Sequence, residues 1–285
     1  MNKKKTRNEK EMPFLDHLEE LRWCIIKSVV AIVVCAIAIY FVSDKLLDIL
    51  IQPYNTAAKG LQKELPKLIF LNPTGGFMIR IKLAAFAGLL AALPIVFYQL
   101  WQFVMPGLLE HERRYVPYIV FFSTLCFLIG AAFCYFVVLR FGLKFLLSFE
   151  TDYMVATISV NEYLQFVTML LFVFGMVFEL PIVAFFFTKI GLLTPAFMRH
   201  YRRHGIVVMV ILSAIITPPD IFTQLLLAAP LIVLYEISIM VSRMALKKTT
   251  DSEDEDEDED DDDAVADAST TKVTRRDDRD KEYED

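Results

Sequence analysis

Residues 116–139 read VPYIVFFSTLCFLIGAAFCYFVVL, twenty-four residues without an acidic or basic side chain. The hydrocarbon core of a bilayer is about 30 Å thick, and about twenty apolar residues cross it as a helix. Because backbone groups in lipid must pair within their own segment, such a run is predicted to be helical. The stretch therefore indicates a membrane protein, and the sequence on either side of it extends that interpretation.

Runs of this kind recur along a chain of 285 residues that is 55 % hydrophobic. They predict an all-α polytopic fold, a concave bundle of six transmembrane helices, at about Cys24–Val42, Phe77–Val104, Val116–Leu139, Tyr163–Phe187, Gly205–Ile216 and Ile221–Val241. The second helix is expected to be broken near Pro94. The last two are expected to be short, and the twelve residues of the fifth rise only about 18 Å. The turn that follows, Thr217–Asp220, is therefore expected to lie below the membrane surface.

The distribution of basic residues predicts the orientation. With the N-terminus inside, the inside segments carry sixteen Lys and Arg residues and the outside segments carry eight. Since cytoplasmic loops are enriched in Lys and Arg, both termini are predicted to be cytoplasmic. The chain then divides into an amphipathic N-terminal segment (1–23), a six-helix transmembrane domain (24–245) and a cytoplasmic tail (246–285).

The tail is strongly acidic. Residues 251–285 carry nineteen acidic and five basic side chains, a net charge of −14, whereas the whole chain is at −6 and the remainder is therefore at +8. With almost no apolar content, the tail is expected to be disordered. It is interpreted either as a solubilising segment or as a contact for basic partners or for the protein's own basic face.

Two short segments place carboxylates at the predicted cytoplasmic surface. Residues 13–22, PFLDHLEELR, form an amphipathic helix in which Phe14 and Leu18 share one face and Glu20 lies on the other. The second segment, Glu110–Arg114, lies between the second and third helices and contains Glu112. Acidic groups are unusual beside anionic lipid headgroups. Glu112 is interpreted either as an ion-pair partner of its basic neighbours or as part of a binding site.

Polar side chains also occur within the apolar runs. Glu179 lies about two-thirds along the fourth helix, where a charge costs several kcal/mol. Either its protonated carboxyl satisfies the carbonyl that Pro181 frees, or it acts in a hydrated cavity or as partner to an incoming polar group. Asp220 is expected to cap the sixth helix, Gln224 to bond a partner helix and Glu236 to pair with Arg243 two turns later.

Signatures of catalytic, nucleotide or metal chemistry are not found in the sequence. It has no phosphate-binding loop and no Gly-x-Ser-x-Gly turn. The four cysteines lie in or beside apolar helices without metal-ligand spacing, and no cleavable signal peptide is recognised. His200 and His204 are four residues apart, but the surrounding arginines favour a basic cytoplasmic loop over a metal pair. The protein is therefore not expected to be an enzyme, to hold a cofactor or metal, or to bind nucleic acid.

An ordered set of motifs resembles the TatC family, the C component of the twin-arginine protein translocase. The resemblance covers about residues 12–245 and rests on Phe14-x-x-His17-Leu18-x-Glu20-Leu21-Arg22, Pro53, Pro73-Thr74, Tyr98-Gln99-x-Trp101-x-Phe103 with Pro106, Glu110-His111-Glu112-Arg113, Phe174-Gly175, Phe178-Glu179-x-Pro181, Thr217-Pro218-Pro219-Asp220 and the region of Glu236. In two places the chain departs from the family pattern. Cys24 stands where a second basic residue is common, and Gly75 stands where an acidic residue is common.

The resemblance implies a receptor in the bacterial cytoplasmic (inner) membrane that binds signal peptides with two consecutive arginines. It also implies that folded proteins are exported at the expense of the proton gradient, with TatA/TatB-type single-span subunits as partners and a homo-oligomer within the complex. The implied signal-peptide contacts are Glu20, Glu112, Phe103 and Arg22. The implied membrane-embedded polar residues are Glu179 and Gln224, and the implied structural or partner contacts are Pro53 in the first outer loop, Asp220 and Glu236.

Two other functions are weighed against this one. A proton-coupled small-molecule transporter, with Glu179 as proton carrier, predicts paired discontinuous helices and several polar groups at mid-membrane. The sequence offers essentially one acid there. A structural membrane scaffold without cargo of its own gives no reason for two carboxylates at the cytoplasmic surface.

Overall fold

The computed structural model describes residues 14–59, 68–104, 116–149, 158–216 and 221–246. In these ranges the chain is helical, apart from short connections and one isolated parallel bridge between Ile69 and Ser159. The helices are α1 (Phe14–Tyr40), α2 (Ser43–Lys59), α3 (Gly75–Val104), α4 (Val116–Phe133), the π-helix η3 (Cys134–Val138), α5 (Leu139–Ser148), α6 (Val160–Phe178), α7 (Leu180–Lys189), α8 (Pro195–His200) and α9 (Arg202–Ile216). A further helix, Ile221–Leu246, is called the C-terminal helix.

Five helical stretches of the described chain are long and apolar enough to cross a membrane: His17–Tyr40, Gly75–Val104, Val116–Ser148, Val160–Lys189 and Ile221–Leu246. They confirm the multi-pass helical fold. The predicted fifth span lies in α9, whose fifteen residues rise only about 22 Å, as expected for a short helix. The C-terminal helix has 26 residues, so the expectation that both of the last helices are short is wrong for it.

Three details differ from the sequence-based expectations. α3 continues through Pro94 without a break, because one proline removes a single backbone hydrogen bond and packing on the neighbouring helices holds the axis. The third span does not end at Leu139 but runs through η3 into α5. The fourth span is interrupted at Glu179, which separates α6 from α7 and is followed by Pro181 in the first turn of α7.

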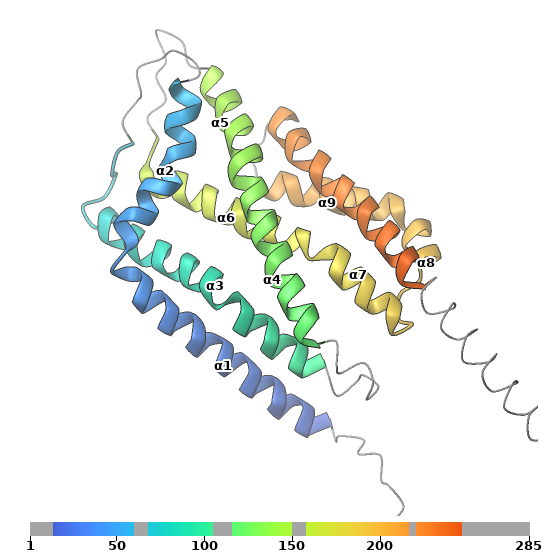
Figure 1. The fold of residues 1–285 in the computed structure, drawn as a ribbon. Helices are drawn as coiled ribbons and strands as arrows, with labels where there is room; N and C mark the ends of the chain where they lie inside the picture. Colours follow the sequence, from blue (N-terminus) through green and yellow to red (C-terminus); the bar gives the residue numbers. More distant parts are fainter. Residues whose placement is uncertain (1–13, 60–67, 105–115, 150–157, 217–220, 247–285) are drawn as a thin grey trace, which may run out of the picture.

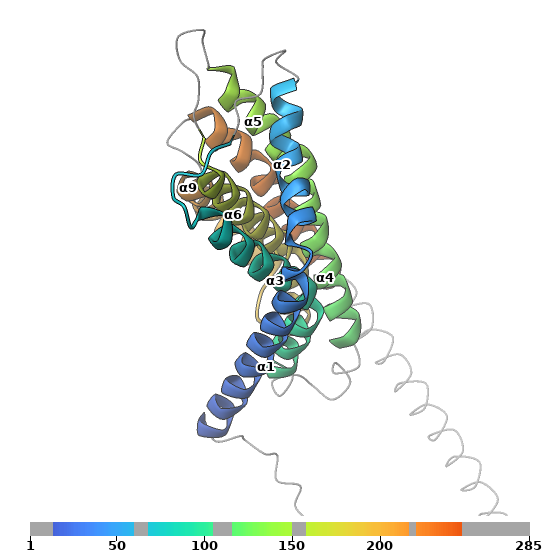
Figure 2. The same ribbon diagram turned by 90° about the vertical axis from the view of Figure 1, so that its left-hand side faces the viewer.

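The helices form a bundle with two distinct ends (Figure 1). α1 lies along α3 at one side, α4 and α6 cross in the middle, and α9 with the C-terminal helix lies on the other side (Figures 1 and 2). The end that holds the start of α1 and the last residues of α3 is called the amino-terminal end. The opposite end, which holds α2, is called the α2 end. After an even number of traverses the C-terminal helix finishes at the amino-terminal end (Figure 1).

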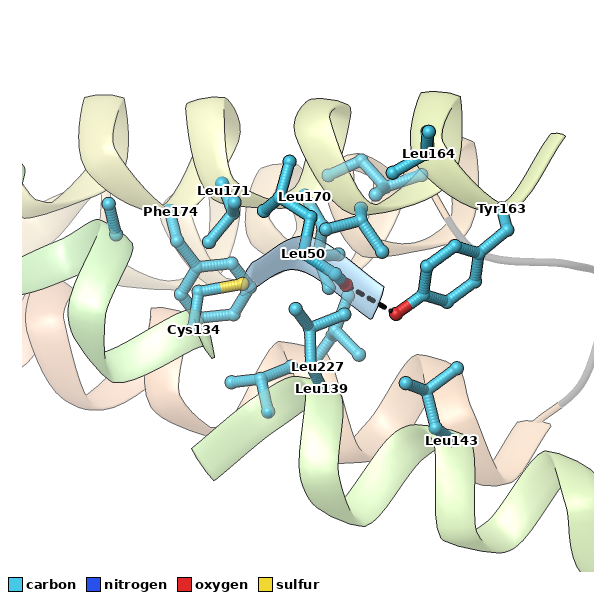
Figure 3. Packing of buried hydrophobic residues seen from close by; sticks show 14 of the residues in the cluster. Leu50, Cys134, Leu139, Leu143, Tyr163, Leu164, Leu170, Leu171, Phe174 and Leu227 are labelled. Carbon is cyan, nitrogen blue, oxygen red and sulfur yellow. Dashed lines mark hydrogen bonds between the residues drawn. The ribbon is translucent and has the colours of Figure 1, made fainter. Parts of the chain in front are cut away.

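The core is apolar and closely packed. Leucines of α5, α6 and the C-terminal helix surround Cys134 of η3 and Phe174 of α6 (Figure 3). Two glycines allow helices to approach closely: Gly175 of α6 faces the ring of Phe127 in α4, and Gly88 of α3 faces the backbone of Ala36 in α1. A Cβ atom at Gly88 would lie 2.6 Å from the Ala36 nitrogen. α1 and α3 are therefore held at contact distance.

The outward surface of α1 is apolar. Its most apolar stretch buries none of its residues within the protein, and Ile25, Val29, Val33 and Ile37 are all exposed. An apolar face of this size on a soluble protein would drive association. Together with the length of the helices, it fits a chain surrounded by lipid.

Candidate functional site: the amino-terminal end of the bundle

At the amino-terminal end, an aromatic contact joins α1 to the end of α3. The rings of His17 and Phe103 stack with centroids 4.3 Å apart and an angle of 13° between their planes. Glu20 lies one turn after His17, and its Oε2 is 3.8 Å from the His17 Nδ1. The contact thus brings two of the predicted site residues, Glu20 and Phe103, to the same place on the surface.

The Glu20 carboxylate remains accessible. Its side chain is 43 % exposed, and His17 is the one ion-pair partner found for it in the part of the chain that the structure describes. A partner at 3.8 Å does not meet the geometry of a hydrogen bond. Glu20 is therefore positioned by its helix while keeping acceptor capacity for a ligand.

Two other predicted signal-peptide contacts are Arg22 and Glu112. Arg22 is exposed and lies on a different face of α1 from Glu20. A separation of two positions corresponds to about 200° of rotation around the helix. Glu112 lies outside the described residues, in the segment between Val104 and Val116.

Glu179 is buried at the junction of α6 and α7, with only 7 % of its surface exposed. Its backbone N–H donates to the Met176 carbonyl over 3.2 Å. Val177 is the residue whose carbonyl Pro181 would leave without its helical partner.

The carboxyl of Glu179 faces α4. The side chain of Ser123 and the backbone at Phe127 are its polar neighbours, and its Oε1 has no hydrogen-bond partner among the described residues. A buried acceptor without a partner is destabilising by about 1–3 kcal/mol. Glu179 thus retains an unmet hydrogen-bonding capacity inside the bundle.

The structure shows the partners of two predicted polar residues in the C-terminal helix, Gln224 and Glu236. Gln224 donates from its Nε2 to the Val210 carbonyl of α9 over 3.4 Å, so its amide has a partner within the chain. Glu236 forms an ion pair with Arg202 of α9. The predicted pairing with Arg243 is wrong, because seven residues separate the two by about 10 Å along the helix. Asp220 lies outside the described residues.

Pro53 lies in α2 and not in a loop, which corrects the expectation for the first outer segment, and it is buried. A proline within a helix leaves the carbonyl four residues earlier without its helical partner. That carbonyl belongs to Ile49 and accepts from the Tyr135 hydroxyl over 2.7 Å. The neighbouring Leu50 carbonyl accepts from the buried Tyr163 hydroxyl over 2.8 Å (Figure 3).

The sequence analysis missed both tyrosines. They lie 86 and 113 residues from their acceptors, and a single tyrosine in an apolar run resembles any other core aromatic. The signal that was available is Pro53 itself, since a helical proline implies a carbonyl in need of a donor. The two hydrogen bonds from these tyrosines join α2 to η3 and α6.

His200 and His204 lie at the other side of the amino-terminal end. In the described ranges, no group of three or more His, Cys, Asp or Glu side chains is arranged to hold a metal ion. Instead His200 and His204 pack against the ring of Tyr201, with centroids 5.1 Å and 5.6 Å away. This part of the surface is basic and aromatic.

Comparisons with known proteins show which family this chain resembles. A family model described as TatC, Sec-independent protein translocase protein, matches residues 16–230. A relative of that name from Desulforapulum autotrophicum is 39 % identical over 248 residues, which cover 87 % of this chain and 90 % of the relative. One from Aquifex aeolicus is 39 % identical over 242 residues, covering 83 % of this chain and 97 % of the relative.

A solved structure gives the same result. A crystal structure of the twin arginine translocase receptor TatC has 37 % sequence identity with this chain and superposes on it with a TM-score of 0.72. The superposition covers 80 % of this chain and 99 % of that one. The similarity therefore extends over nearly the whole of the solved protein.

Proposed function

The chain belongs to the TatC family of Sec-independent protein translocase proteins, and from this premise we propose that it is the receptor that binds twin-arginine signal peptides through Glu20 and Glu112. The observation that carries the proposal is the stacking of His17 on Phe103. It holds Glu20 beside the end of α3, where the chain continues toward Glu112. The alternative function, a small-molecule transporter, is rejected because the matched proteins are protein translocases.

The chemistry of arginine suits two carboxylates at this end. A guanidinium group donates five hydrogen bonds in a fixed planar fork and pairs with a carboxylate through two of them. One exposed ion pair contributes only about 0–1 kcal/mol. Two such pairs beside the half-buried ring of Phe103, on which a guanidinium can also stack, bind more strongly. Lysine lacks the fork, so a Lys-Lys peptide should bind more weakly.

The wider arrangement follows from the charges and the family. We propose cytoplasmic termini in a bacterial inner membrane, with residues 1–23, 24–245 and 246–285 as N-terminal segment, membrane domain and acidic tail. The single-span TatA/TatB-type subunits are proposed to contact α9 and the C-terminal helix, and the chain is proposed to assemble with copies of itself. The receptor carries out no catalysis, and the proton gradient supplies the energy for transport.

The site is tested by photo-crosslinking from position 103, where a photoreactive phenylalanine replaces Phe103. A peptide with two arginines should crosslink, and Glu20→Ala or Glu112→Ala should reduce the yield at least tenfold. Glu19→Ala is the matched control, because Glu19 is an exposed acid on the same helix turn, and it should leave the yield unchanged. A Lys-Lys peptide should crosslink poorly to all variants.

One outcome of this experiment would contradict the proposed site. If the Glu20→Ala, Glu112→Ala double variant crosslinks the Arg-Arg peptide as wild type does, the two carboxylates are not the receptor site. Membrane extraction of each variant shows that it is inserted and folded, which separates lost binding from lost protein.

For Glu179 we propose a role in transport after binding, supported by its burial and its unpartnered Oε1. Glu179→Gln should leave crosslinking from position 103 unchanged while reducing export of a folded cargo into membrane vesicles. Undiminished export by Glu179→Gln would restrict this residue to a structural role at the α6–α7 junction.

A further inference from the structure

The side of the amino-terminal end away from α1 carries a basic surface that the signal-peptide site does not use. Residues 180–219 contain Lys189, Arg199, Arg202 and Arg203 but not a single Asp or Glu. Arg199 and His200 end α8, and Arg203 and His204 begin α9. These four side chains, all exposed, are called the α8–α9 basic surface.

Packing holds this surface in a defined shape. The Tyr235 hydroxyl of the C-terminal helix donates to the Met198 carbonyl over 2.9 Å, and its ring fills the space left by Gly205 of α9. Phe197, Tyr201 and His204 form a continuous row of ring contacts. The charges are therefore presented from a rigid platform of α8, α9 and the C-terminal helix.

The basic surface lacks acids of its own. Glu236 neutralises Arg202, but across the described segments neither Arg199 nor Arg203 has a carboxylate within ion-pair distance. The positive charges of Arg199 and Arg203 therefore need counterions from elsewhere. The candidates are lipid headgroups, solution ions, another protein and an acidic segment of this chain.

The chain supplies such a segment nearby. In residues 251–263, twelve of the thirteen side chains are acidic. The C-terminal helix ends at Leu246, and just before that point Ser242 is hydrogen-bonded to Thr188, near the end of α7 and a few residues before α8. Figure 1 shows the end of this helix beside α8.

Length permits the contact. From Leu246 to Asp251 five residues extend at most about 17 Å, and the thirteen-residue acidic run extends up to about 45 Å. Glu236, which touches Arg202, lies ten residues before Leu246, or about 15 Å along the helix. The acidic run therefore reaches every arginine of the α8–α9 basic surface without moving a helix.

We propose that the acidic run 251–263 docks onto the α8–α9 basic surface and is its counter-charge. Each exposed ion pair is weak, but the tether keeps the acidic run at an effective concentration in the millimolar range. Docking also relieves the mutual repulsion of twelve neighbouring carboxylates. Anionic lipid headgroups compete for the same arginines, so the tail limits lipid contact at this surface.

The test uses the full-length chain in nanodiscs of neutral phosphatidylcholine, with a photoreactive phenylalanine in place of Phe197. Phe197 lies in α8, is 54 % exposed and contacts the ring of Tyr201. Mass spectrometry should find crosslinks from position 197 to residues 251–271. Position 18 on α1 is the matched control, because Leu18 is 45 % exposed at the same end of the bundle, and it should crosslink to the tail at least fivefold less.

Two variants examine the electrostatic cause. Replacing the acidic residues of 251–263 by Asn and Gln keeps the length and should reduce crosslinking from position 197 at least fivefold. The Arg199→Gln, Arg203→Gln variant should do the same, and 1 M salt should act similarly on wild type because the screening length falls to about 3 Å.

Several results would overturn the proposal. They are crosslinks from position 197 to lipid alone, equal tail crosslinking from positions 18 and 197, and crosslinking that persists after the acids are neutralised. None of these outcomes bears on Glu20 or Glu112, so the docked tail and the receptor site fail or succeed separately.

Discussion

The two ends of the bundle use their polar groups differently. At the α2 end, polar groups find partners within the chain: Tyr135 and Tyr163 donate to the carbonyls beside Pro53, and Arg80 pairs with Asp44 over 2.8 Å. At the amino-terminal end, the one ion-pair partner that Glu20 has among the described residues is a histidine at 3.8 Å. Internally satisfied groups stabilise a structure, whereas groups held in place without full partners are available to a ligand. The difference fits a scaffold at one end and the proposed recognition surface at the other.

Gly88→Ala should have the largest effect, because α1 must pack on α3 for the recognition surface to form. A Cβ atom at this position would lie 2.6 Å from the Ala36 nitrogen, so the helices must separate. Overpacking of this kind costs about 1–3 kcal/mol. We expect a lower thermal unfolding midpoint in detergent and at least tenfold weaker crosslinking of an Arg-Arg peptide from position 103.

Gly76→Ala is the matched control for that variant. A Cβ atom there would approach nothing more closely than 4.0 Å, and alanine is favoured over glycine within a helix by about 0.5–1 kcal/mol. Gly76→Ala should therefore be neutral or slightly stabilising. Equal stability of Gly88→Ala and wild type would show that the two helices can separate without loss.

Tyr163→Phe should come next and should affect stability alone. It removes the donor to the Leu50 carbonyl at a buried position, which costs about 1–3 kcal/mol. Tyr135→Phe removes the corresponding donor at an exposed position, where water replaces it, and should cost about 0.5–1.5 kcal/mol. Unfolding in detergent measures both, and crosslinking from position 103 should stay at the wild-type level. Loss of peptide binding in Tyr163→Phe would contradict the separation of the two ends.

The sequence predicted some of these features and not others, for physical reasons. Runs such as residues 116–139 have few alternatives in lipid, so the helices and their order were predictable. The prediction that Glu20 and Phe103 belong to one site came only from family motifs. The reason is that 83 residues separate them and no periodicity links positions so far apart. The pairing of Glu236 with Arg202 was missed because it depends on how α9 packs, whereas Arg243 was suggested by spacing within one helix.

His17→Ala should have a smaller effect, confined to the recognition surface. An aromatic pair contributes about 0.5–1.5 kcal/mol beyond the burial of its surface, so losing the stack on Phe103 should weaken peptide binding about two- to tenfold. The unfolding midpoint should barely change, because both residues lie at the surface end of their helices. A titration of a fluorescent Arg-Arg peptide measures the affinity.

His17→Phe distinguishes the two contacts of this histidine. It keeps a ring against Phe103 and removes the Nδ1 that lies near Glu20. Binding close to wild type in His17→Phe would assign the effect to stacking. Binding as weak as in His17→Ala would assign it to the histidine nitrogen and contradict the role given to the stack.

The smallest effect should come from the ion pair between Asp44 and Arg80. The two side chains are 70 % and 50 % exposed, and exposed pairs contribute about 0–1 kcal/mol. A double-mutant cycle with Asp44→Asn and Arg80→Gln isolates the coupling between them, measured as the free energy of unfolding in detergent. We expect a coupling below about 1 kcal/mol that disappears in 1 M salt. A coupling above 2 kcal/mol that survives the salt would mean that charge, and not the tyrosine–carbonyl bonds, fixes α2, and the α2 end would then resemble the charged recognition surface more than a scaffold.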